Sequence, residues 1–228
     1  MSNQLRAIIF ANGKLSDPTA VRQRILPGDM IVAADGGAQH CLKLSLNPDI
    51  LIGDFDSIDP AQLQRLQQGG TQIIRHPARK DYTDLELALQ HVQALGVTHC
   101  LVFAGLGARW DQTLANLLLP ATVGLSQVRI DYIDGNQELT VLHTGDRHEI
   151  LGRSGDTVSL IPLNADVHGV STEGLEYPLA DERLIFGETR GVSNVLVGEH
   201  ALISVREGLL LCAILHHESF SGSSGFDE

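Results

Sequence analysis

The sequence predicts an α/β protein in two parts: a parallel sheet with helices on both faces, followed by an antiparallel β-sandwich. Two observations predict this order. Over about the first 135 residues, continuous apolar runs alternate with helical patterns, which is typical of strands buried on both sides by helices. After about residue 138, short strand-like runs follow one another at regular spacing, with glycine, asparagine and aspartate turns between them. That pattern is typical of a sandwich.

The N-terminal part contains a series of predicted strands, most of which run into a polar or glycine-rich turn. We expect them at Leu5–Phe10, Ile31–Ala34, Ile50–Ile52, Thr71–Ile74, Cys100–Ala104 and Val128–Ile133. In an open α/β sheet the ligand lies beyond the carboxyl ends of the strands. We therefore expect a Rossmann-like domain over residues 1–137, with its site at those turns.

One helix is expected to begin after Thr83. Thr83 and Glu86 have the spacing of a capping box, in which each side chain binds a backbone N–H group at the helix start. Apolar residues then recur with helical spacing from Leu85 to Val92, and Gly96 provides a stop. The exposed N–H groups and the helix dipole favour an anion at this start, either the Asp84 side chain or a phosphate.

The C-terminal part is expected to be a β-sandwich over residues 138–218, followed by a flexible tail over residues 219–228. Its predicted strands are Leu139–His143, Thr157–Ile161, Val167–Val170, Arg183–Phe186 and Ala201–Val205. The boundary is placed in the turn-forming segment DGNQEL, residues 134–139. The tail SFSGSSGFDE is rich in glycine and serine, which is typical of frayed chain ends.

Composition excludes several classes of protein. Lys and Arg total 16 against 28 Asp and Glu, a net charge of −12, which argues against a nucleic-acid-binding protein. Cys41, Cys100 and Cys212 are odd in number and far apart. We therefore expect no disulfide framework or thiolate metal site, and free thiols in a reducing cytoplasm. We expect no membrane span and no secretory signal, because no apolar stretch approaches the ~20 residues that a span needs.

Carboxylates gather at the predicted strand ends and helix starts of the N-terminal sheet. They are Asp35, Asp54, Asp56, Asp81, Asp84 and Asp111, with Lys80 and Arg109 as the basic residues among them. Such hard oxygen ligands suit Mg²⁺, which binds one or two carboxylates together with substrate phosphates. Asp54 and Asp56 follow a buried strand and repel each other unless something positive lies nearby. We therefore predict a Mg²⁺ site; the alternative is a simple Asx turn.

Five motifs lie in order along the chain. They are Ala34-Asp35-Gly36-Gly37, Gly53-Asp54-Phe55-Asp56-Ser57, Lys80-Asp81-Tyr82-Thr83-Asp84 with Glu86-Leu87-Ala88-Leu89, Gly107-Ala108-Arg109-Trp110-Asp111 with Thr113-Leu114-Ala115-Asn116, and Thr189-Arg190-Gly191-Val192-Ser193-Asn194. In this order and spacing they resemble the thiamine pyrophosphokinase family. Two positions depart from its pattern: Arg79, where an acidic residue is common, and Ala108, in place of a glycine. Ala108 limits how closely the backbone approaches a phosphate.

The resemblance implies an enzyme, a thiamine diphosphokinase. Such an enzyme transfers the diphosphoryl group of ATP to the hydroxyethyl oxygen of thiamine, giving thiamine diphosphate and AMP. The resemblance also implies Mg²⁺ as cofactor. It further implies a homodimer, in which the α/β domain of one subunit and the thiamine-binding sandwich of the other build each site.

The resemblance assigns roles by position. Asp54, Asp56 and Asp81 would hold Mg²⁺. ATP would be bound by Lys80, Asp81, Thr83, Asp84 and Arg109, and thiamine by Asp111, Ser193 and Asn194. The expected catalytic residues are Asp35, Asp54, Asp56 and Arg109. Either Asp35 or Asp56 could accept the proton of the thiamine hydroxyl, and the sequence leaves that choice open.

Two other functions stay open at this point. A hydrophobic strand followed by Asp54-x-Asp56 also resembles the nucleophile motif of haloacid-dehalogenase-like phosphatases, with Asp54 attacking phosphate. Against this, two predicted strands precede the motif here. The other alternative is a non-catalytic module that binds thiamine or a nucleotide, which the motif spacing alone does not exclude.

Overall fold

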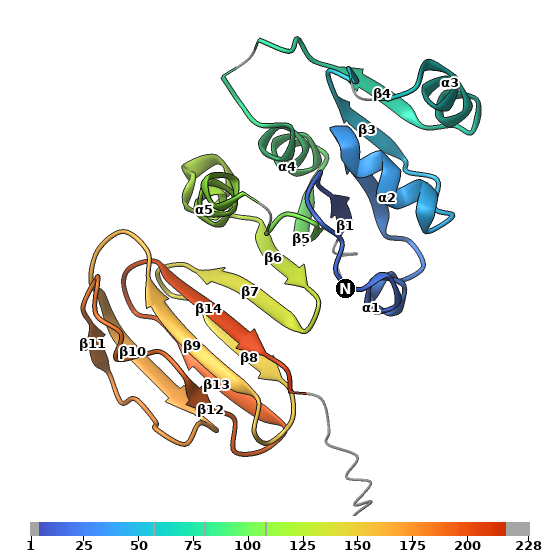
Figure 1. Ribbon diagram of the computed structural model, residues 1–228. Coiled ribbons are helices and arrows are strands. Elements are labelled where there is room, and N and C mark those ends of the chain that lie inside the picture. The colour runs from blue at the N-terminus through green and yellow to red at the C-terminus, as the bar shows by residue number, and fades with distance from the viewer. Residues whose placement is uncertain (1–4, 57, 80, 108, 218–228) are drawn as a thin grey trace, which may run out of the picture.

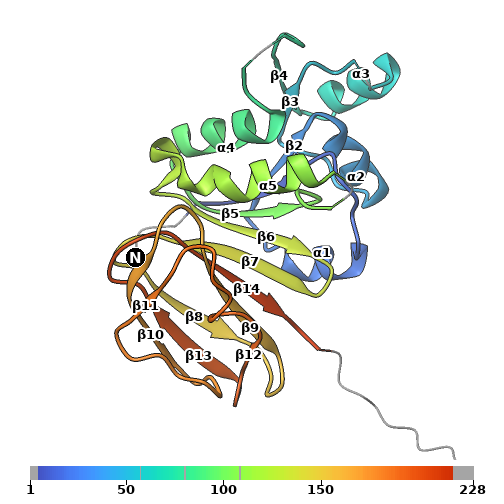
Figure 2. The same ribbon diagram turned by 60° about the vertical axis from the view of Figure 1, so that its left-hand side comes forward.

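The computed structural model describes residues 5–56, 58–79, 81–107 and 109–217. The N-terminal half is a parallel sheet between two layers of helices, and the C-terminal half is a sandwich of two sheets (Figures 1 and 2). The predicted fold class is therefore confirmed. The tail predicted at 219–228 lies outside the described residues.

The parallel strands set the position of a ligand crevice. They are β1 (Leu5–Phe10), β2 (Met30–Ala34), β3 (Ile50–Gly53), β4 (Gln72–Arg75), β5 (Val97–Phe103) and β6 (Arg129–Asp134). Their order across the sheet is β6-β5-β1-β2-β3-β4, with every neighbouring pair parallel. After β4 the chain crosses back to the other side of β1. Ligands of open α/β sheets bind beyond the carboxyl ends of the strands at such a reversal.

Helices bury both faces of this sheet. Three of them, α1 (Pro18–Arg24), α2 (Ala38–Lys43) and α3 (Pro60–Gln68), pack on the face that carries Ile8 and Phe10. On the opposite face, α4 (Asp84–Ala94) and α5 (Trp110–Leu118) pack against the residues around Ala7 and Ile9. Successive side chains of a strand point to opposite faces. The apolar runs of the inner strands β1, β2, β3 and β5 are continuous because these strands are covered on both sides, while the edge strand β4 is only partly buried.

The sandwich continues the same sheet. Its strands are β7 (Gln137–Leu142), β8 (Arg147–Leu151), β9 (Thr157–Pro162), β10 (Val167–Glu173), β11 (Glu182–Leu184), β12 (Asn194–Val195), β13 (His200–Ser204) and β14 (Leu210–Leu215). Strand β7 pairs antiparallel with β6, so β12-β9-β14-β7 and the parallel strands form one ten-stranded sheet. A four-stranded sheet, β11-β10-β13-β8, packs against it. The domain boundary after residue 137 stays a prediction, and backbone pairing runs through it.

Sequence patterns missed three strands, β8, β12 and β14. Strand β14 lies between β7 and β9. Its Leu210 and Cys212 face the sandwich interior, while Leu211 packs in a small cluster with Leu209 that Leu117 of α5 adjoins. A strand buried on both faces lacks the polar alternation that usually marks a strand in an antiparallel sheet. Strand β12 has only two residues, too few for any periodicity.

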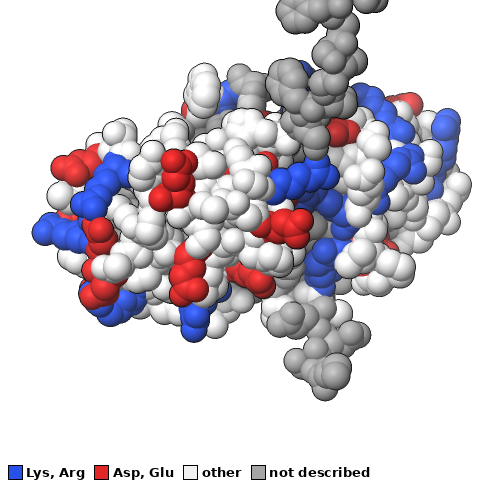
Figure 3. Space-filling view, turned by 90° about the horizontal axis from the view of Figure 1, so that it is seen from below, with Lys and Arg blue, Asp and Glu red and all other residues white. Residues whose placement is uncertain are grey.

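Ion pairs join the two halves beside α1. Arg24 pairs with Glu138 of β7, whose Oε1 also lies 3.1 Å from Nε2 of His216. Nδ1 of the same imidazole is 2.8 Å from Oδ2 of Asp156. Figure 3, the molecule seen from below, shows Lys and Arg side chains spread over this face with Asp and Glu side chains among them. His216 lies between the carboxylates of Glu138 and Asp156, and its hydrogen bonds to them raise its pKa, although burial opposes the shift.

This arrangement predicts a pH-dependent stability. Because the folded state raises the pKa of His216, its contribution is full below the unfolded value of about 6.5 and is lost as pH rises through the folded pKa. We expect the free energy of unfolding to fall by about 1 kcal/mol more in the wild type than in His216→Gln between about pH 6 and pH 8.5. Urea unfolding measures this, with His217→Gln as the control because His217 contacts Thr157 and not Glu138. Equal pH slopes in the wild type and His216→Gln would contradict it.

Cys41, Cys100 and Cys212 are free and buried, as predicted. Burial raises the pKa of each thiol to about 12, so all three are protonated packing residues at neutral pH. Within the described ranges, no helix is long and apolar enough to cross a membrane.

Candidate active site

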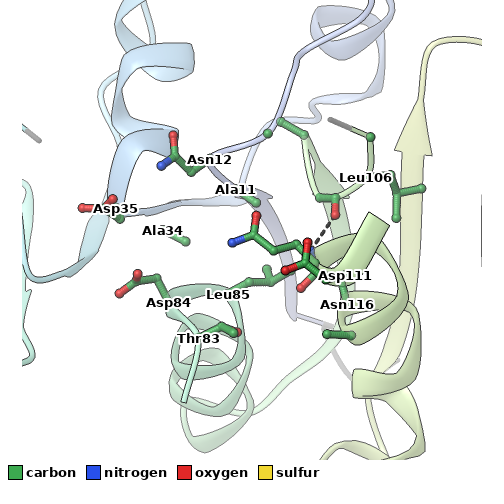
Figure 4. A pocket seen from close by; sticks show the side chains of 16 residues that line it. Ala11, Asn12, Ala34, Asp35, Thr83, Asp84, Leu85, Leu106, Asp111 and Asn116 are labelled. Atoms are coloured by element: carbon green, nitrogen blue, oxygen red, sulfur yellow. Dashed lines mark hydrogen bonds between the residues drawn. The ribbon is translucent and has the colours of Figure 1, made fainter. Parts of the chain in front are cut away.

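A cavity of about 430 Å³ lies at the carboxyl ends of β1, β2 and β5, closed by the starts of α4 and α5 (Figure 4). This is the point where the strand order reverses, between β5 and β1. Its lining residues are Ala11, Asn12, Gly13, Ala34, Asp35, Thr83, Asp84, Leu85, Ala104, Gly105, Leu106, Gly107, Asp111, Gln112, Ala115 and Asn116. The cavity therefore lies where the topology predicts a ligand.

Three of the predicted acidic residues meet at the ends of β2 and β3. Each of Asp35, Asp54 and Asp56 offers one carboxylate oxygen. These three oxygens lie within 4.8 Å of one another, close enough to hold one cation. Carboxylate oxygens are the donors that Mg²⁺ prefers. Asp81 is exposed and is not part of this group, so its role as a metal ligand stays a prediction. Lys80 lies outside the described residues.

The loop after β3 is held by the residue between the two aspartates. Phe55 has a positive φ of 64° and is only 5% exposed, in the core under α2 and α3. The Arg75 guanidinium lies 4.9 Å from its ring centroid and donates to the Asp54 carbonyl oxygen at 2.8 Å. Oδ1 of Asp54 accepts the Asp56 N–H at 3.1 Å, so the Asx turn is present. Burial of Phe55 therefore holds both flanking carboxylates at the mouth of the site.

Asp35 reaches this cluster through a tight turn after β2. Its φ is +45°, and the two glycines that follow allow close packing: a Cβ on Gly37 would lie 1.9 Å from the Phe10 carbonyl oxygen. The Asp35 side chain is 9% exposed. Burial raises its pKa, and the charges of Asp84, Asp54 and Asp56 add to the shift. A carboxylate cluster of this kind favours a bound cation, which would let every member ionise.

The start of α4 has the predicted cap. Oγ1 of Thr83 accepts the Glu86 N–H at 3.2 Å, and Asp84 opens the helix. Thr83 and Asp84 both line the cavity, and Figure 4 shows Asp84 on the same side as Asp35. The helix start therefore presents exposed N–H groups at the rim of the site, where an anionic group is stabilised.

Arg109 and Asp111 lie on the other side of the cavity, at the start of α5. The guanidinium binds the carboxylate through two hydrogen bonds, one of them from Nε to Oδ1 at 3.1 Å. The pair raises the pKa of Arg109 and lowers that of Asp111. Both side chains are about two-thirds exposed, at 66% and 65%. The structure thus places Arg109, which is predicted to bind ATP, in contact with Asp111, which is predicted to bind thiamine.

Residues that sequence reasoning did not assign hold the glycine loop after β5. Nδ2 of Asn116 donates to the Gly105 carbonyl oxygen at 2.6 Å (Figure 4), and Oγ1 of Thr113 accepts the Gly107 N–H at 3.0 Å. The buried Tyr132 hydroxyl donates in turn to the Asn116 carbonyl oxygen. Asn116 and Thr113 follow Asp111 in the same motif, and that proximity is the signal that could have found them.

Ser193 and Asn194 are remote from this cavity in the same chain. They lie at β12, at the end of the sandwich away from the α/β half (Figures 1 and 2), and neither lines the cavity. Ser193 has a positive φ of 62°, and its N–H donates to Oγ of Ser159 at 3.1 Å. The Asn194 amide holds the backbone of Tyr177, accepting its N–H at 3.0 Å and donating to its carbonyl oxygen at 2.7 Å.

Comparison with known families matches both halves of the chain. A family model described as "Thiamin pyrophosphokinase, catalytic domain" matches residues 22–131, and one described as "Thiamin pyrophosphokinase, vitamin B1 binding domain" matches residues 146–210. The chain belongs to the thiamine pyrophosphokinase family. The residues predicted for metal and ATP, together with Asp111, fall within the catalytic match, and Ser193 and Asn194 fall within the vitamin B1 binding match.

Several thiamine pyrophosphokinases are similar to this member of the family, and for some of them a structure has been solved. Thiamine pyrophosphokinase from Bacillus subtilis is 27% identical over 180 residues, covering 79% of this chain and 84% of that protein. Thiamin pyrophosphokinase 1 from Caenorhabditis elegans is 25% identical over 217 residues, covering 89% and 86%. The solved structure of a thiamin pyrophosphokinase from Geobacillus thermodenitrificans superposes with a TM-score of 0.80 at 25% identity, covering 94% of this chain and 99% of that one. These relatives do not support the phosphatase or the non-catalytic alternative.

Proposed function

We propose that this protein transfers the diphosphoryl group of ATP to thiamine. In this reaction the hydroxyethyl oxygen of thiamine forms a bond to the β-phosphorus of ATP. The bond from that phosphorus to the oxygen bridging the α- and β-phosphates breaks, and AMP leaves. The hydroxyl proton passes to a carboxylate or to water. The observation that carries the proposal is the meeting of Asp35, Asp54 and Asp56 beside the cavity, in a chain with both domains of the family.

The cofactor in this proposal is Mg²⁺, held by Asp54, Asp56 and Asp35, with Asp81 as a further candidate. The fit rests on hard oxygen donors within reach of one ion. When bound, Mg²⁺ would neutralise phosphate charge as the diphosphoryl group moves. Catalysis by this chain is then mainly a matter of positioning.

The nucleotide in this proposal binds between α4 and α5. Thr83 and Asp84 lie at the α4 start, where backbone N–H groups can receive a phosphate. Lys80 and Arg109 are the proposed cationic ligands, and Arg109 would exchange its exposed pairing with Asp111 for the phosphates. Asp111, released in this way, would attract the thiazolium cation of thiamine.

We favour Asp35 over Asp56 as the acceptor of the thiamine proton. Asp35 lines the cavity. In the absence of a cation its pKa is raised, mainly by burial and also by the charges of the neighbouring carboxylates. Asp56 is exposed and does not line the cavity. The choice therefore rests on position, because a proton acceptor must come within hydrogen-bond reach of the thiamine hydroxyl.

A homodimer would bring Ser193 and Asn194 to the site. Within one chain they do not line the cavity. The outer face of α5 beside the cavity exposes Trp110, Leu114 and Leu118, with Trp110 82% exposed, and this apolar stripe favours a covering partner. Val192 and Val197, which flank the Ser193 turn, are exposed as well. We propose that the α5 stripe meets the partner's sandwich, in a cytoplasmic protein whose buried thiols stay reduced.

The deciding experiment incubates the protein with Mg-ATP, with and without thiamine, and separates the nucleotides. We expect AMP only when thiamine is present, in equal amount to thiamine diphosphate. Thiamine monophosphate, whose hydroxyl is blocked, serves as the control acceptor and should release no AMP. ADP or inorganic phosphate in place of AMP would show attack at another phosphorus. Thiamine binding without any turnover would favour the non-catalytic module.

A further inference from the structure

A second hollow lies at the opposite end of the sheet from the candidate active site. It measures about 850 Å³, within the range of small-molecule sites. Its walls come from the first residues of β5 and β6, the last residues of β7, the start of β8 and the loops beside them. Parallel strands carry their carboxyl ends to the candidate site, so the start of β6 faces away from it. This hollow is therefore separate from the carboxylate cluster.

A buried imidazole points to a ligand here. His148 lines the hollow and is only 5% exposed, since β8 turns His148 and Ile150 inward and its other side chains outward. Among the described residues, its imidazole makes no hydrogen bond and no ion pair. Burial, and then the charge of Arg129, lower its pKa, so the ring is neutral and keeps one N–H to donate. Its ring nitrogens are not among the fully buried, unpartnered side-chain atoms of the described residues, so they reach the hollow, where the N–H can donate to a ligand.

Two guanidinium groups add unused donors. Arg129 binds Asp131 through Nε, at 2.9 Å from Oδ2 and 3.1 Å from Oδ1, and within the described ranges its terminal N–H groups have no hydrogen-bond partner. Arg147 lines the same hollow, is exposed, and forms no ion pair in the described part of the chain. Guanidinium N–H groups match the oxygens of phosphate in pairs.

Two carboxylates near the hollow already have partners: Asp146, which lines it, and Asp131, which does not line it but binds Arg129 and Thr140 of its wall. Asp131 accepts hydrogen bonds from Thr140 at 2.6 Å and from Arg129, and lies 2.7 Å from Nε2 of His99. Burial opposes ionisation of Asp131, but these contacts lower its pKa to about 2. Asp146 accepts the His143 N–H at 2.7 Å. Among the described residues, the hydrogen-bonding groups of this hollow that lack a partner are therefore mainly donors, which suits an anion.

We propose that this hollow is a binding site for a small molecule carrying a phosphate or diphosphate group, held by Arg129, Arg147 and His148. The anion oxygens accept from the two guanidinium groups at the mouth and from the imidazole N–H at the floor. The site does not depend on the reaction proposed above. Inorganic phosphates and organic phosphate esters share this chemistry, and the experiment separates them.

The test is calorimetric titration of the full chain without Mg²⁺ and with EDTA, so that the carboxylate cluster offers the anion no metal. The probes are inorganic pyrophosphate, inorganic phosphate and ribose 5-phosphate. We expect one saturable site, weakened about tenfold or more in Arg147→Gln and in His148→Gln. Arg65→Gln is the matched control, because it removes an exposed arginine of α3 that lies outside the hollow. Tighter binding of the ester would identify an organic ligand, and tighter binding of pyrophosphate an inorganic one.

A second measurement keeps the test independent of folding in the variants. The imidazole proton resonances of His148 in the wild-type protein should shift during the pyrophosphate titration, with the affinity found by calorimetry. Equal affinities in Arg147→Gln and Arg65→Gln would overturn the proposal. So would His148 resonances that do not move at saturating pyrophosphate.

Discussion

Replacing Asp54 with asparagine is expected to lower the rate of AMP formation about a thousandfold. The substitution keeps the size of the side chain but removes one negative oxygen from the cluster of Asp35, Asp54 and Asp56. Charge stabilisation by a bound metal is worth several kcal/mol, and each 1.4 kcal/mol is about a factor of ten in rate. Steady-state assays with Mg-ATP and thiamine measure the effect.

A binding measurement without turnover separates loss of metal from loss of fold. Mn²⁺ titrated into the protein and followed by electron paramagnetic resonance should bind more weakly in Asp54→Asn than in the wild type. Glu188→Gln is the control, because it removes one exposed carboxylate from the sandwich. A variant that keeps more than about a tenth of the wild-type rate would remove Asp54 from the metal site.

Mixing two inactive variants is expected to restore activity if the site is shared between subunits. Asp54→Asn disables the α/β contribution, and Ser193→Arg places a cation where the thiazolium of thiamine is proposed to bind. Asp54→Asn keeps the size of a half-buried side chain, and Ser193 is exposed, so both variants should fold. In a symmetric dimer the mixed species has one site with both native residues. An equal mixture should therefore regain about a quarter of the wild-type rate after subunit exchange.

The complementation result depends directly on the separation of Ser193 from the cavity. Each variant alone, taken through the same exchange, is the control and should stay inactive. Sedimentation should show a dimer, and Trp110→Glu on the α5 stripe should weaken it, because a buried charge without a partner is unfavourable. A mixture as inactive as its components, in a protein that does exchange subunits, would place the whole site within one chain.

Local features of this protein could be predicted from the sequence alone. The N-cap at Thr83 forms as predicted, with its Oγ1 accepting the Glu86 N–H, because a cap depends on residues three positions apart. The parallel strands were predicted because burial on both faces leaves an uninterrupted apolar run. The carboxylates were predicted near the site because strand ends and ligand crevices coincide in open α/β sheets.

Only the tertiary structure decided which of these groups meet. Asp35 lies 19 residues before Asp54 in the sequence, and adjacency of β2 and β3 with the tight glycine packing brings them together, while Asp81 lies outside the cluster. The pairing of β6 with β7, which joins both halves in one sheet, likewise depends on strand order. So does the second hollow, where β8 brings His148 near the start of β6. Sequence periodicity reports the burial of each segment, but contacts between distant segments depend on which strands pair and in what register.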